Sequence, residues 1–362
     1  MIYADAVIIG AGPSGLTAAK ELLTAGVNVT LIDRNMSLGG QLIKQTHKFF
    51  GSESEHASKR GIDIKQILLN DLVPYKESLI ILSKTTVVGL YKDKVIACLR
   101  GDTYFKVKAK TIIIATGASE KSIPFENNDL PGVYAAGAVQ TLMNEYGVKP
   151  GNEVLMVGSG NIGLIVTYQL MQAGIKVKAI LEAAPKISGY LVHASKVRRL
   201  GVPIHTKTSI KRALGKDPVE GAILWDLDED WQGIQGSERE IKVDTICISV
   251  GLAPLVELLE QIGAKVEYIR ELGGNVPIIN DAYETTIEGV FACGDAAGIE
   301  EASSAMVEGR IAGLGALRTL GIAQTEENTK VTDLHKKLGA LRDGPHGAKV
   351  KAGYMKRRVM HD

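Results

Sequence analysis

Two glycine-rich segments of the chain have the residue types and spacing that hold the phosphates of a nucleotide. Residues 10–15 read GAGPSG after the apolar run AVII, and residues 158–163 read GSGNIG after the apolar run VLMV. In such a strand–turn–helix, the first glycine allows the turn, the second lets a pyrophosphate approach the backbone, and the third lets helix pack on strand. The helix N-terminus adds free N–H groups and the positive end of its dipole. Two such sites in one chain indicate two nucleotides held together to exchange a hydride.

The two segments begin an internal repeat of about 30 residues, the length of the start of a βαβ unit. Besides the motif glycines, a shift of 148 positions aligns Leu22, Ala25 and Gly26 with Leu170, Ala173 and Gly174.

Each repeat has a carboxylate near the end of its second strand. Asp33 lies 23 residues past Gly10, where a carboxylate can bind both ribose hydroxyls. Glu182 lies 24 residues past Gly158. Since one residue of slip reverses the face of a strand, Glu182 either lies just beyond the strand or does not meet the ribose. If it does meet the ribose, it repels the 2′-phosphate of NADP, which favours NAD(H) over NADP(H).

Composition narrows the remaining classes of function. The 362 residues suffice for two domains and a tail, and the net charge of +1 gives no indication of nucleic acid as a partner. No run of 18 apolar residues and no basic leader is present, so we expect a soluble, cytoplasmic protein without a membrane span. The cysteines, at 98, 247 and 293, lack the spacing of a redox pair or metal site and lie in apolar runs, so we expect buried, inert thiols.

The elements that must position these residues follow the two repeats. The fold is predicted to be α/β, with two Rossmann-like, three-layer dinucleotide-binding domains, the second inserted into the first. The expected elements are strand–helix–strand over 5–33, a loop and helix over 34–70, an antiparallel meander over 78–110, a buried strand over 111–118, the same plan again over 150–249, a buried strand ending at 294–295, and a helix over about 300–320.

These elements divide the chain into three parts. The first domain comprises residues 1–120 and 250–322, the second comprises 121–249, and residues 323–362 form a basic C-terminal tail. Residues 326–362 contain 9 Lys or Arg and 5 Asp or Glu, a net charge of +4. The tail is either a solvated, partly mobile segment or a contact for a partner subunit.

Several separated motifs, in this order, resemble a known superfamily: the first glycine motif with Asp33, ATG at 115–117, the second glycine motif, VGLAP at 250–254, and Gly294-Asp295. Over residues 1–320 the chain is similar to flavoproteins with two dinucleotide-binding domains, the pyridine nucleotide–disulfide oxidoreductase superfamily. The resemblance implies FAD in the first domain and NAD(H) in the second.

The resemblance also implies roles for single residues. Asp295 either hydrogen-bonds the ribityl or pyrophosphate side of FAD or merely caps a helix. The helix after it directs its N-terminus at the flavin pyrimidine edge, where its dipole stabilises the charge of the reduced state. No side chain is expected to be an obligatory catalyst, and no metal site is expected. The FAD-binding residues are expected to be Gly10, Gly12, Pro13, Ser14, Gly15, Asp33, Arg34, Gly40, Gln41, Val88, Thr116, Gly117, Gly294, Asp295 and Ala302. The NAD-binding residues are expected to be Gly158, Gly160, Asn161, Ile162, Glu182 and Gly251.

The redox cysteines of the disulfide reductases are missing. One group of the superfamily carries them where this chain reads GQLIKQTH (40–47), and the thioredoxin reductase group carries a CxxC where this chain reads YAAGAVQTL (134–142). A thiol–disulfide step is therefore excluded, and electrons must leave the flavin another way.

A narrower resemblance fits this absence. Residues 130–141, 294–305 and 341–347 are similar to the alpha-type subunits of dye-linked L-proline dehydrogenase, opine oxidase, hydrogen cyanide synthase and heterotetrameric sarcosine oxidase. The resemblance implies a partner, a second flavoprotein that oxidises an amino acid or amine. Several relatives carry a cysteine-rich iron–sulfur module, whereas this chain has no cysteine after Cys293, so a cluster would belong to an iron–sulfur protein as partner.

The sequence thus predicts an FAD-dependent oxidoreductase subunit that transfers a hydride between NAD(H) and FAD and exchanges electrons with a partner protein. Two alternatives stay open. One is a stand-alone NADH oxidase or NADH:acceptor reductase. The other is a structural or regulatory subunit whose second site holds ADP, ATP or nothing, and the spacing of Glu182 keeps this alternative open.

Overall fold

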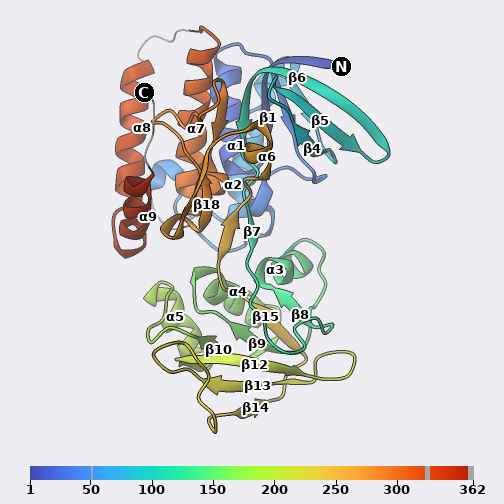
Figure 1. The fold of residues 1–362 in the computed structure, drawn as a ribbon, viewed down its shortest axis with the longest axis vertical. Coiled ribbons are helices and arrows are strands. Elements are labelled where there is room, and N and C mark those ends of the chain that lie inside the picture. Colours follow the sequence, from blue (N-terminus) through green and yellow to red (C-terminus); the bar gives the residue numbers. More distant parts are fainter. Residues whose placement is uncertain (50–51, 323–326, 358–362) are drawn as a thin grey trace. The chain divides into compact units, whose positions relative to one another are not determined.

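The computed structural model describes residues 1–49, 52–322 and 327–357 of the chain. The chain forms two compact units, of which the first comprises Met1–Ser119 with Ala253–Asp362 and the second comprises Glu120–Leu252 (Figure 1). The two crossings between them are the short strands β7 (Ala118–Glu120) and β16 (Leu252–Pro254), which pair with each other. The predicted fold class, an α/β domain inserted into another, is confirmed.

The first unit is built on a mostly parallel sheet. Its strands lie in the order β3 (Leu79–Leu82), β2 (Val29–Ile32), β1 (Ile2–Ile9), β6 (Thr103–Ile114), β5 (Val95–Arg100) and β4 (Thr86–Leu90), and β19 (Val290–Ala292) also pairs with β6. The meander was expected to begin at residue 78, but β3 pairs in parallel with β2. Because the helix α2 (Gly61–Asn70) lies between β2 and β3 as a crossover, these two strands run in the same direction, and only β4 to β6 form the meander.

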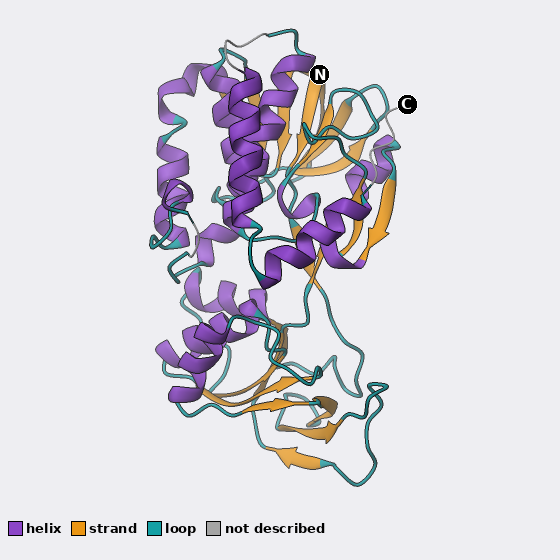
Figure 2. Cartoon of the chain, turned by 90° about the vertical axis from the view of Figure 1, so that its left-hand side faces the viewer, coloured by secondary structure: helices purple, strands orange, loops and turns teal. Residues whose placement is uncertain are grey.

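Helices α1 (Pro13–Thr24) and α7 (Ala302–Thr319) pack against each other in the first unit (Figures 1 and 2). Glycines on α7 make this contact possible. A Cβ added at Gly309 would lie 2.1 Å from the Ser14 carbonyl oxygen, and one added at Gly313 would lie 3.0 Å from the Ala18 carbonyl oxygen. The predicted helix over residues 300–320 therefore lies directly against the helix that follows the first glycine motif.

The C-terminal residues fold onto the first unit as α8 (Glu327–Leu341) and α9 (Pro345–Lys356). Leu334 and Leu338 of α8 are buried in the core of this unit, and α8 packs on α7 (Figure 1). The expectation of a solvated tail is therefore wrong for residues 327–357. The rest of the predicted tail, 323–326 and 358–362, lies outside the described residues.

The second unit has three layers around a five-stranded parallel sheet. The strand order is β11 (Ile204–Thr206), β10 (Lys176–Glu182), β9 (Glu153–Val157), β15 (Thr245–Ile248) and β8 (Val133–Ala135). Helices α3 (Ala136–Asn144), α4 (Asn161–Gln172) and α5 (Leu191–Arg199) belong to one layer, and the meander β12 (Thr208–Leu214), β13 (Gly221–Asp226) and β14 (Arg239–Ile241) forms another. Along β9, Val154 and Met156 are buried with the helices and Leu155 and Val157 with the meander, because successive side chains of a strand face opposite sides.

The remaining elements of the first unit are short: η1 (Gly40–Lys44), η2 (Glu53–Glu55), η3 (Val73–Ser78), α6 (Glu257–Ile262), β17 (Val266–Ile269), η4 (Arg270–Leu272), β18 (Gly274–Pro277) and η5 (Gly294–Ala296). Within the described parts of the chain, no helix combines the length and the apolar character that crossing a membrane requires.

Candidate functional site

The first glycine motif forms a cradle at the carboxyl ends of β1 and β6. Gly10 has φ +104°, and a Cβ there would lie 2.2 Å from the Ala115 carbonyl oxygen. A Cβ at Gly15 would lie 1.9 Å from the Gly10 carbonyl oxygen. A Cβ at Gly12, by contrast, would have no neighbour closer than the Gly40 Cα at 3.9 Å. The fold therefore requires the first and third glycines, while the second leaves room for a ligand's phosphates, as the motif predicts.

Asp33 follows β2 and faces this cradle. Its Oδ2 accepts a hydrogen bond from the Ala11 N–H (2.8 Å), and its Oδ1 accepts one from the Asn35 N–H (2.7 Å). A carboxylate has about four acceptor sites, so two remain for other donors. The geometry thus fits the predicted binding of two ribose hydroxyls.

The Gly294-Asp295 turn packs against the same motif. A Cβ at Gly294 would lie 2.5 Å from the Ser14 Oγ, so the turn and the motif are in contact. The Asp295 Oδ1 accepts the Glu300 N–H (3.3 Å), and burial raises the pKa of Asp295 to about 6. Asp295 does not cap α7, because the N-cap residue of that helix is Glu301. No side chain caps α7, which leaves the N–H groups near Ala302 available to a ligand.

The remaining residues predicted to bind FAD differ in how close they lie to this cradle. Pro13 is the first residue of α1, and a Cβ at Gly40 would lie 2.8 Å from the Gly12 Cα. The Thr116 hydroxyl donates to the Leu255 carbonyl oxygen (3.1 Å), while Gly117 has φ +76°. Arg34 and Gln41 are exposed. Val88 lies on β4 and is 48% exposed. Thr85, the residue just before β4, donates its N–H to the Asp33 carbonyl oxygen (2.9 Å).

The second glycine motif repeats the same contacts within the second unit. A Cβ at Gly158 would lie 2.0 Å from the Ser249 carbonyl oxygen, and one at Gly163 would lie 2.3 Å from the Gly158 carbonyl oxygen. At Gly160 the nearest neighbour of an added Cβ is the Ser188 Oγ, at 4.0 Å. Gly251 follows β15 with φ +117°, in the place that Gly117 has after β6. This cradle, too, has room for phosphates at its second glycine.

Two other predicted residues of this site begin α4. Asn161 is the first residue of the helix, and its Oδ1 accepts the Tyr190 N–H (2.8 Å). Ile162 is 36% exposed. Both belong to the second glycine motif itself.

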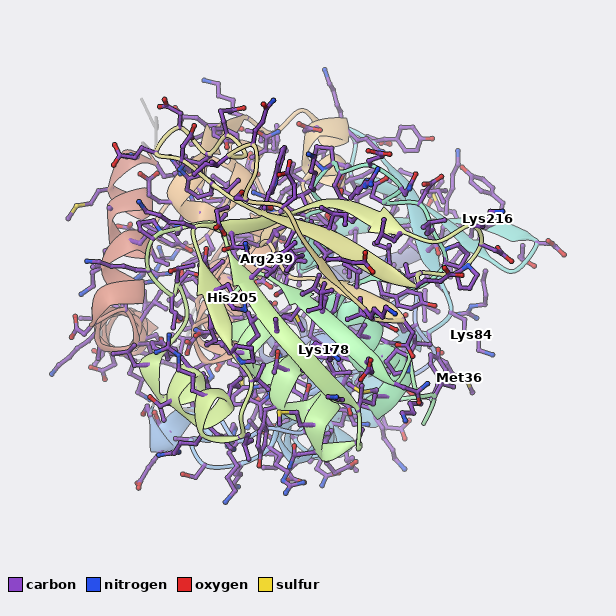
Figure 3. All side chains as sticks on the ribbon, turned by 90° about the horizontal axis from the view of Figure 1, so that it is seen from below. Met36, Lys84, Lys178, His205, Lys216 and Arg239 are labelled. Atoms are coloured by element: carbon purple, nitrogen blue, oxygen red, sulfur yellow. The ribbon has the colours of Figure 1, made fainter. Side chains whose placement is uncertain are left out.

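Glu182 occupies the position of Asp33 despite its extra residue of spacing. The alternative that it lies just beyond the strand is wrong, because β10 contains a β-bulge. The pairing of β10 with β9 shifts between Val177 and Ala179, and the extra residue is Lys178 (Figure 3). Glu182 is consequently the last residue of β10. Its Oε2 accepts the Ser159 N–H (3.3 Å) and its Oε1 the Ala184 N–H (2.9 Å), as Asp33 accepts those of Ala11 and Asn35.

The internal repeat extends well beyond its first 30 residues. Lys84 and Lys207 both have positive φ (49° and 51°) and donate their N–H groups to the carbonyl oxygens of Asn35 and Ala184 (3.0 and 3.1 Å). The sequence signal for this part of the repeat is SKTT at 83–86 against TKTS at 206–209, which sequence reasoning missed.

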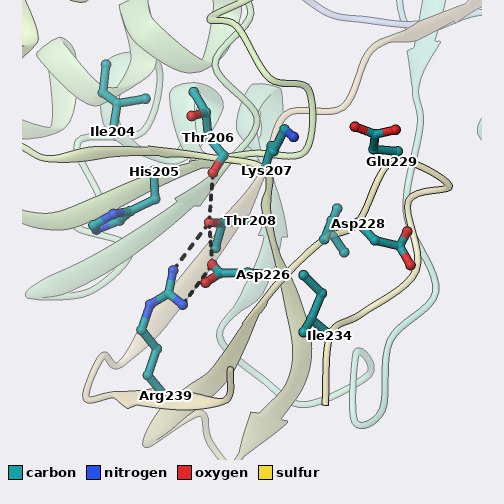
Figure 4. A pocket seen from close by; sticks show the side chains of 11 residues that line it. Ile204, His205, Thr206, Lys207, Thr208, Asp226, Asp228, Glu229, Ile234 and Arg239 are labelled. Atoms are coloured by element: carbon teal, nitrogen blue, oxygen red, sulfur yellow. Dashed lines mark hydrogen bonds and ion pairs between the residues drawn. The ribbon is translucent and has the colours of Figure 1, made fainter. Parts of the chain in front are cut away.

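The hydroxyl contacts of Thr85 recur at Thr208. Arg100 Nε donates to the Thr85 Oγ1 (2.9 Å), and Arg239 Nη2 donates to the Thr208 Oγ1 (3.3 Å). Figure 4 shows Arg239 also paired with Asp226 (2.9 Å) beside a cavity of about 660 Å³ at the edge strand β11. Lys207 and Thr208 therefore occupy in the second unit the positions that Lys84 and Thr85 have in the first.

A buried polar cluster links the C-terminal helices to the Gly294 turn. Glu308 of α7 has a fully buried side chain, and its Oε2 accepts the Gly294 N–H (2.8 Å). Its Oε1 accepts hydrogen bonds from the hydroxyls of Tyr283 (2.8 Å) and Tyr354 (2.6 Å) and from Arg342 (2.7 Å). Helix α9 and the residue after α8 thereby support the turn that carries Asp295.

The three cysteines are free and buried, as predicted. Burial raises the pKa of Cys98 to about 11 and also raises the pKa of Cys247 and of Cys293. Thiols in such surroundings are not reactive. Among the residues that the structure describes, no group of three or more His, Cys, Asp or Glu side chains is placed to hold a metal ion.

Known proteins similar to this chain include subunits of two enzymes and an L-proline dehydrogenase. The chain is 27% identical to hydrogen cyanide synthase subunit HcnB of Pseudomonas protegens, over 88% of this chain and 71% of that protein. It is 24% identical to an opine oxidase subunit of Agrobacterium tumefaciens, over 92% and 69%. The crystal structure of L-proline dehydrogenase from P. horikoshii is similar with a TM-score of 0.72 and 25% identity, over 92% of this chain and 59% of that one. The chain therefore spans only part of each relative, and the predicted resemblance is confirmed.

The family model for pyridine nucleotide-disulphide oxidoreductases matches residues 4–309, which include both cradles and the Gly294 turn. Similar proteins include subunits of a hydrogen cyanide synthase and an opine oxidase and an L-proline dehydrogenase. The chain is an FAD/NAD(P)-dependent oxidoreductase and belongs to the pyridine nucleotide-disulphide oxidoreductase family.

Proposed function

We propose that the first unit binds FAD, that the second unit binds NAD(H), and that the protein transfers a hydride between them without a redox disulfide. The observation that carries the proposal is the duplicated cradle. Each unit has a second glycine open to a ligand and a buried carboxylate held by the backbone of its own glycine motif. The buried cysteines give no thiol route for the electrons.

The residues of the first unit would hold FAD as follows. Gly12 admits the pyrophosphate, and the two free acceptor sites of Asp33 bind the ribose hydroxyls. The uncapped N-terminus of α7 stabilises negative charge at the flavin. Bound FAD supplies the two-electron chemistry, and the side chains contribute binding, orientation and electrostatics rather than acid–base catalysis.

We further propose NAD(H) rather than NADP(H) for the second unit. Glu182 ends β10 in the ribose position, and its carboxylate would repel a 2′-phosphate. No arginine lies among the residues 183–190 that follow it.

The proposed electron partner is a second protein, either a flavoprotein subunit that oxidises an amino acid or amine or an iron–sulfur protein. The support is that two relatives are named as subunits of hydrogen cyanide synthase and opine oxidase. A contact for this partner is proposed on the exposed, basic side of the C-terminal helices, which carries Lys336, Lys337 and Lys349.

The test is an anaerobic absorption spectrum of the purified chain, recorded before and after addition of NADH and then NADPH. We expect a flavin band that NADH bleaches. Gly12→Glu is expected to abolish FAD binding, and Gly160→Glu is expected to abolish bleaching while FAD stays bound. NADH oxidation that survives Gly160→Glu unchanged would refute the second site.

Two further outcomes decide between the proposal and its alternatives. A flavin band that NADH leaves unchanged, together with tight binding of ATP, would support a structural or regulatory second site. Steady NADH turnover by the isolated chain with oxygen or a dye would support a stand-alone oxidase. Absence of FAD binding would refute the proposal as a whole.

A further inference from the structure

The carboxylate of Glu182 is already occupied by the protein's own hydroxyl groups. Its Oε2 accepts hydrogen bonds from the Ser159 N–H (3.3 Å), the Ser159 hydroxyl and the Ser188 hydroxyl (2.8 Å), and its Oε1 accepts the Ala184 N–H (2.9 Å). Three of these four donors bind Oε2, which leaves it no free acceptor site, and Oε1 keeps one. Two ribose hydroxyls therefore cannot bind Glu182 while both serines hold it.

The first unit lacks both hydroxyls. Ala11 stands where the second unit has Ser159, and among the described residues Asp33 accepts hydrogen bonds from two backbone N–H groups. The Gly39 N–H donates to the Ala11 carbonyl oxygen (2.8 Å) as the Gly189 N–H donates to that of Ser159 (2.9 Å), so Leu38 is the counterpart of Ser188. The two carboxylates thus occupy equivalent positions, and only that of the second unit is blocked.

Of the two serines, Ser188 is the one that can move. Ser159 is fully buried, and its hydroxyl also accepts the Ser188 N–H (3.3 Å). Ser188 is exposed, so its hydroxyl can rotate into water without leaving a buried group unpaired. Its Oγ is also the atom nearest to a Cβ built on Gly160 (4.0 Å), the glycine at which the phosphates would approach.

We propose that Ser188 is a latch on the second nucleotide site: its hydroxyl occupies the ribose-binding face of Glu182 in the free protein, and the ribose hydroxyls of an adenine nucleotide bind Glu182 only by displacing it. The inference rests on the proposed function of the second unit as a nucleotide site. It implies that Ser188 lowers the affinity for nucleotides whose ribose hydroxyls bind Glu182.

The latch predicts a tighter site when the hydroxyl is removed. Ser188→Ala removes the hydrogen bond between the Ser188 hydroxyl and the Glu182 carboxylate, which the ligand must otherwise break. A hydrogen bond to a charged group corresponds to about a tenfold change in the affinity for the nucleotide. We expect the Kd for NAD+, measured by titration calorimetry on the full chain, to fall about tenfold. Ser195→Ala, an exposed serine on α5, is the matched control and is expected to leave the Kd unchanged.

A second ligand tests whether the ribose is the group that competes with the latch. ADP is expected to gain the same factor from Ser188→Ala, whereas 2′,3′-dideoxy-ADP, which has no hydroxyl to offer Glu182, is expected to gain nothing. An equal gain for both nucleotides, an unchanged Kd or a weaker affinity in Ser188→Ala would overturn the latch. If neither the wild type nor the variant binds any of these nucleotides, the proposed function of the second unit fails instead.

Discussion

Replacing Glu308 by alanine tests whether the C-terminal helices are part of the candidate flavin site. The carboxylate of this buried residue accepts hydrogen bonds from Tyr283, Tyr354, Arg342 and the backbone of Gly294. In Glu308→Ala, all four donors lose this acceptor. Arg342 keeps its second carboxylate, because its Nε lies 3.0 Å from the Glu300 Oε2.

The magnitude of the expected loss follows from these contacts. Removing one partner from a buried, charged hydrogen-bond network costs about 3–5 kcal/mol of unfolding free energy. Because Arg342 keeps its bond to Glu300, we expect a loss of unfolding free energy at the lower end of this range, about 3 kcal/mol. Since the Gly294 N–H is among the donors, we also expect the Gly294-Asp295 turn to loosen and FAD to bind more weakly.

The assay is equilibrium unfolding in denaturant, combined with hydrogen exchange of the peptide that spans residues 290–300 in the FAD-free chain. Glu308→Ala is expected to lower the unfolding free energy and to speed exchange in this peptide. Glu238→Ala, at an exposed ion pair with Lys211, is the control and is expected to change neither. A Glu308→Ala chain as stable as the wild type, with unchanged exchange at the turn, would refute the reasoning.

Three further predictions concern packing, pH and the thiols. Gly309→Ala is expected to destabilise the chain by about 1–3 kcal/mol in denaturant unfolding, because its Cβ meets the Ser14 carbonyl oxygen at 2.1 Å, whereas Gly339→Ala, with open space on α8, is expected to be neutral or stabilising. Burial raises the pKa of Asp295 from 3.8 to about 6, so the stability that this group contributes is full below pH 3.8 and is lost as pH rises to about 6. When unfolding is measured from pH 4 to 8 without FAD, the unfolding free energy of Asp295→Asn is therefore expected to rise relative to that of the wild type, by about 3 kcal/mol at most. A difference in unfolding free energy that does not change with pH would contradict this. Because all three cysteines are buried, we expect a thiol reagent to modify them only after unfolding, and rapid reaction of the native chain would show that one is accessible.

The sequence alone determined the duplicated nucleotide-binding plan. Glycines at fixed offsets after apolar runs admit few folded arrangements, because at Gly10 and Gly15 any side chain would collide with backbone. Asp33 was equally predictable, since its strand is regular and its spacing from Gly10 fixes the face of the sheet on which it lies. The absence of redox cysteines from two defined segments was also visible without a structure.

Only the tertiary structure decided where Glu182 lies and what the C-terminal residues do. A bulge at Lys178 gives Glu182 the register of Asp33, which the residue spacing had left open. The bulge is set by pairing with β9 rather than by any local residue type. The basic composition of residues 326–362 indicated either a solvated segment or a contact for a partner subunit. Burial of Leu334 and Leu338 and the hydrogen bonds of Arg342 and Tyr354 to Glu308 fix residues 327–357 to the first unit. Such contacts join residues far apart in sequence, so local pattern could not reveal them.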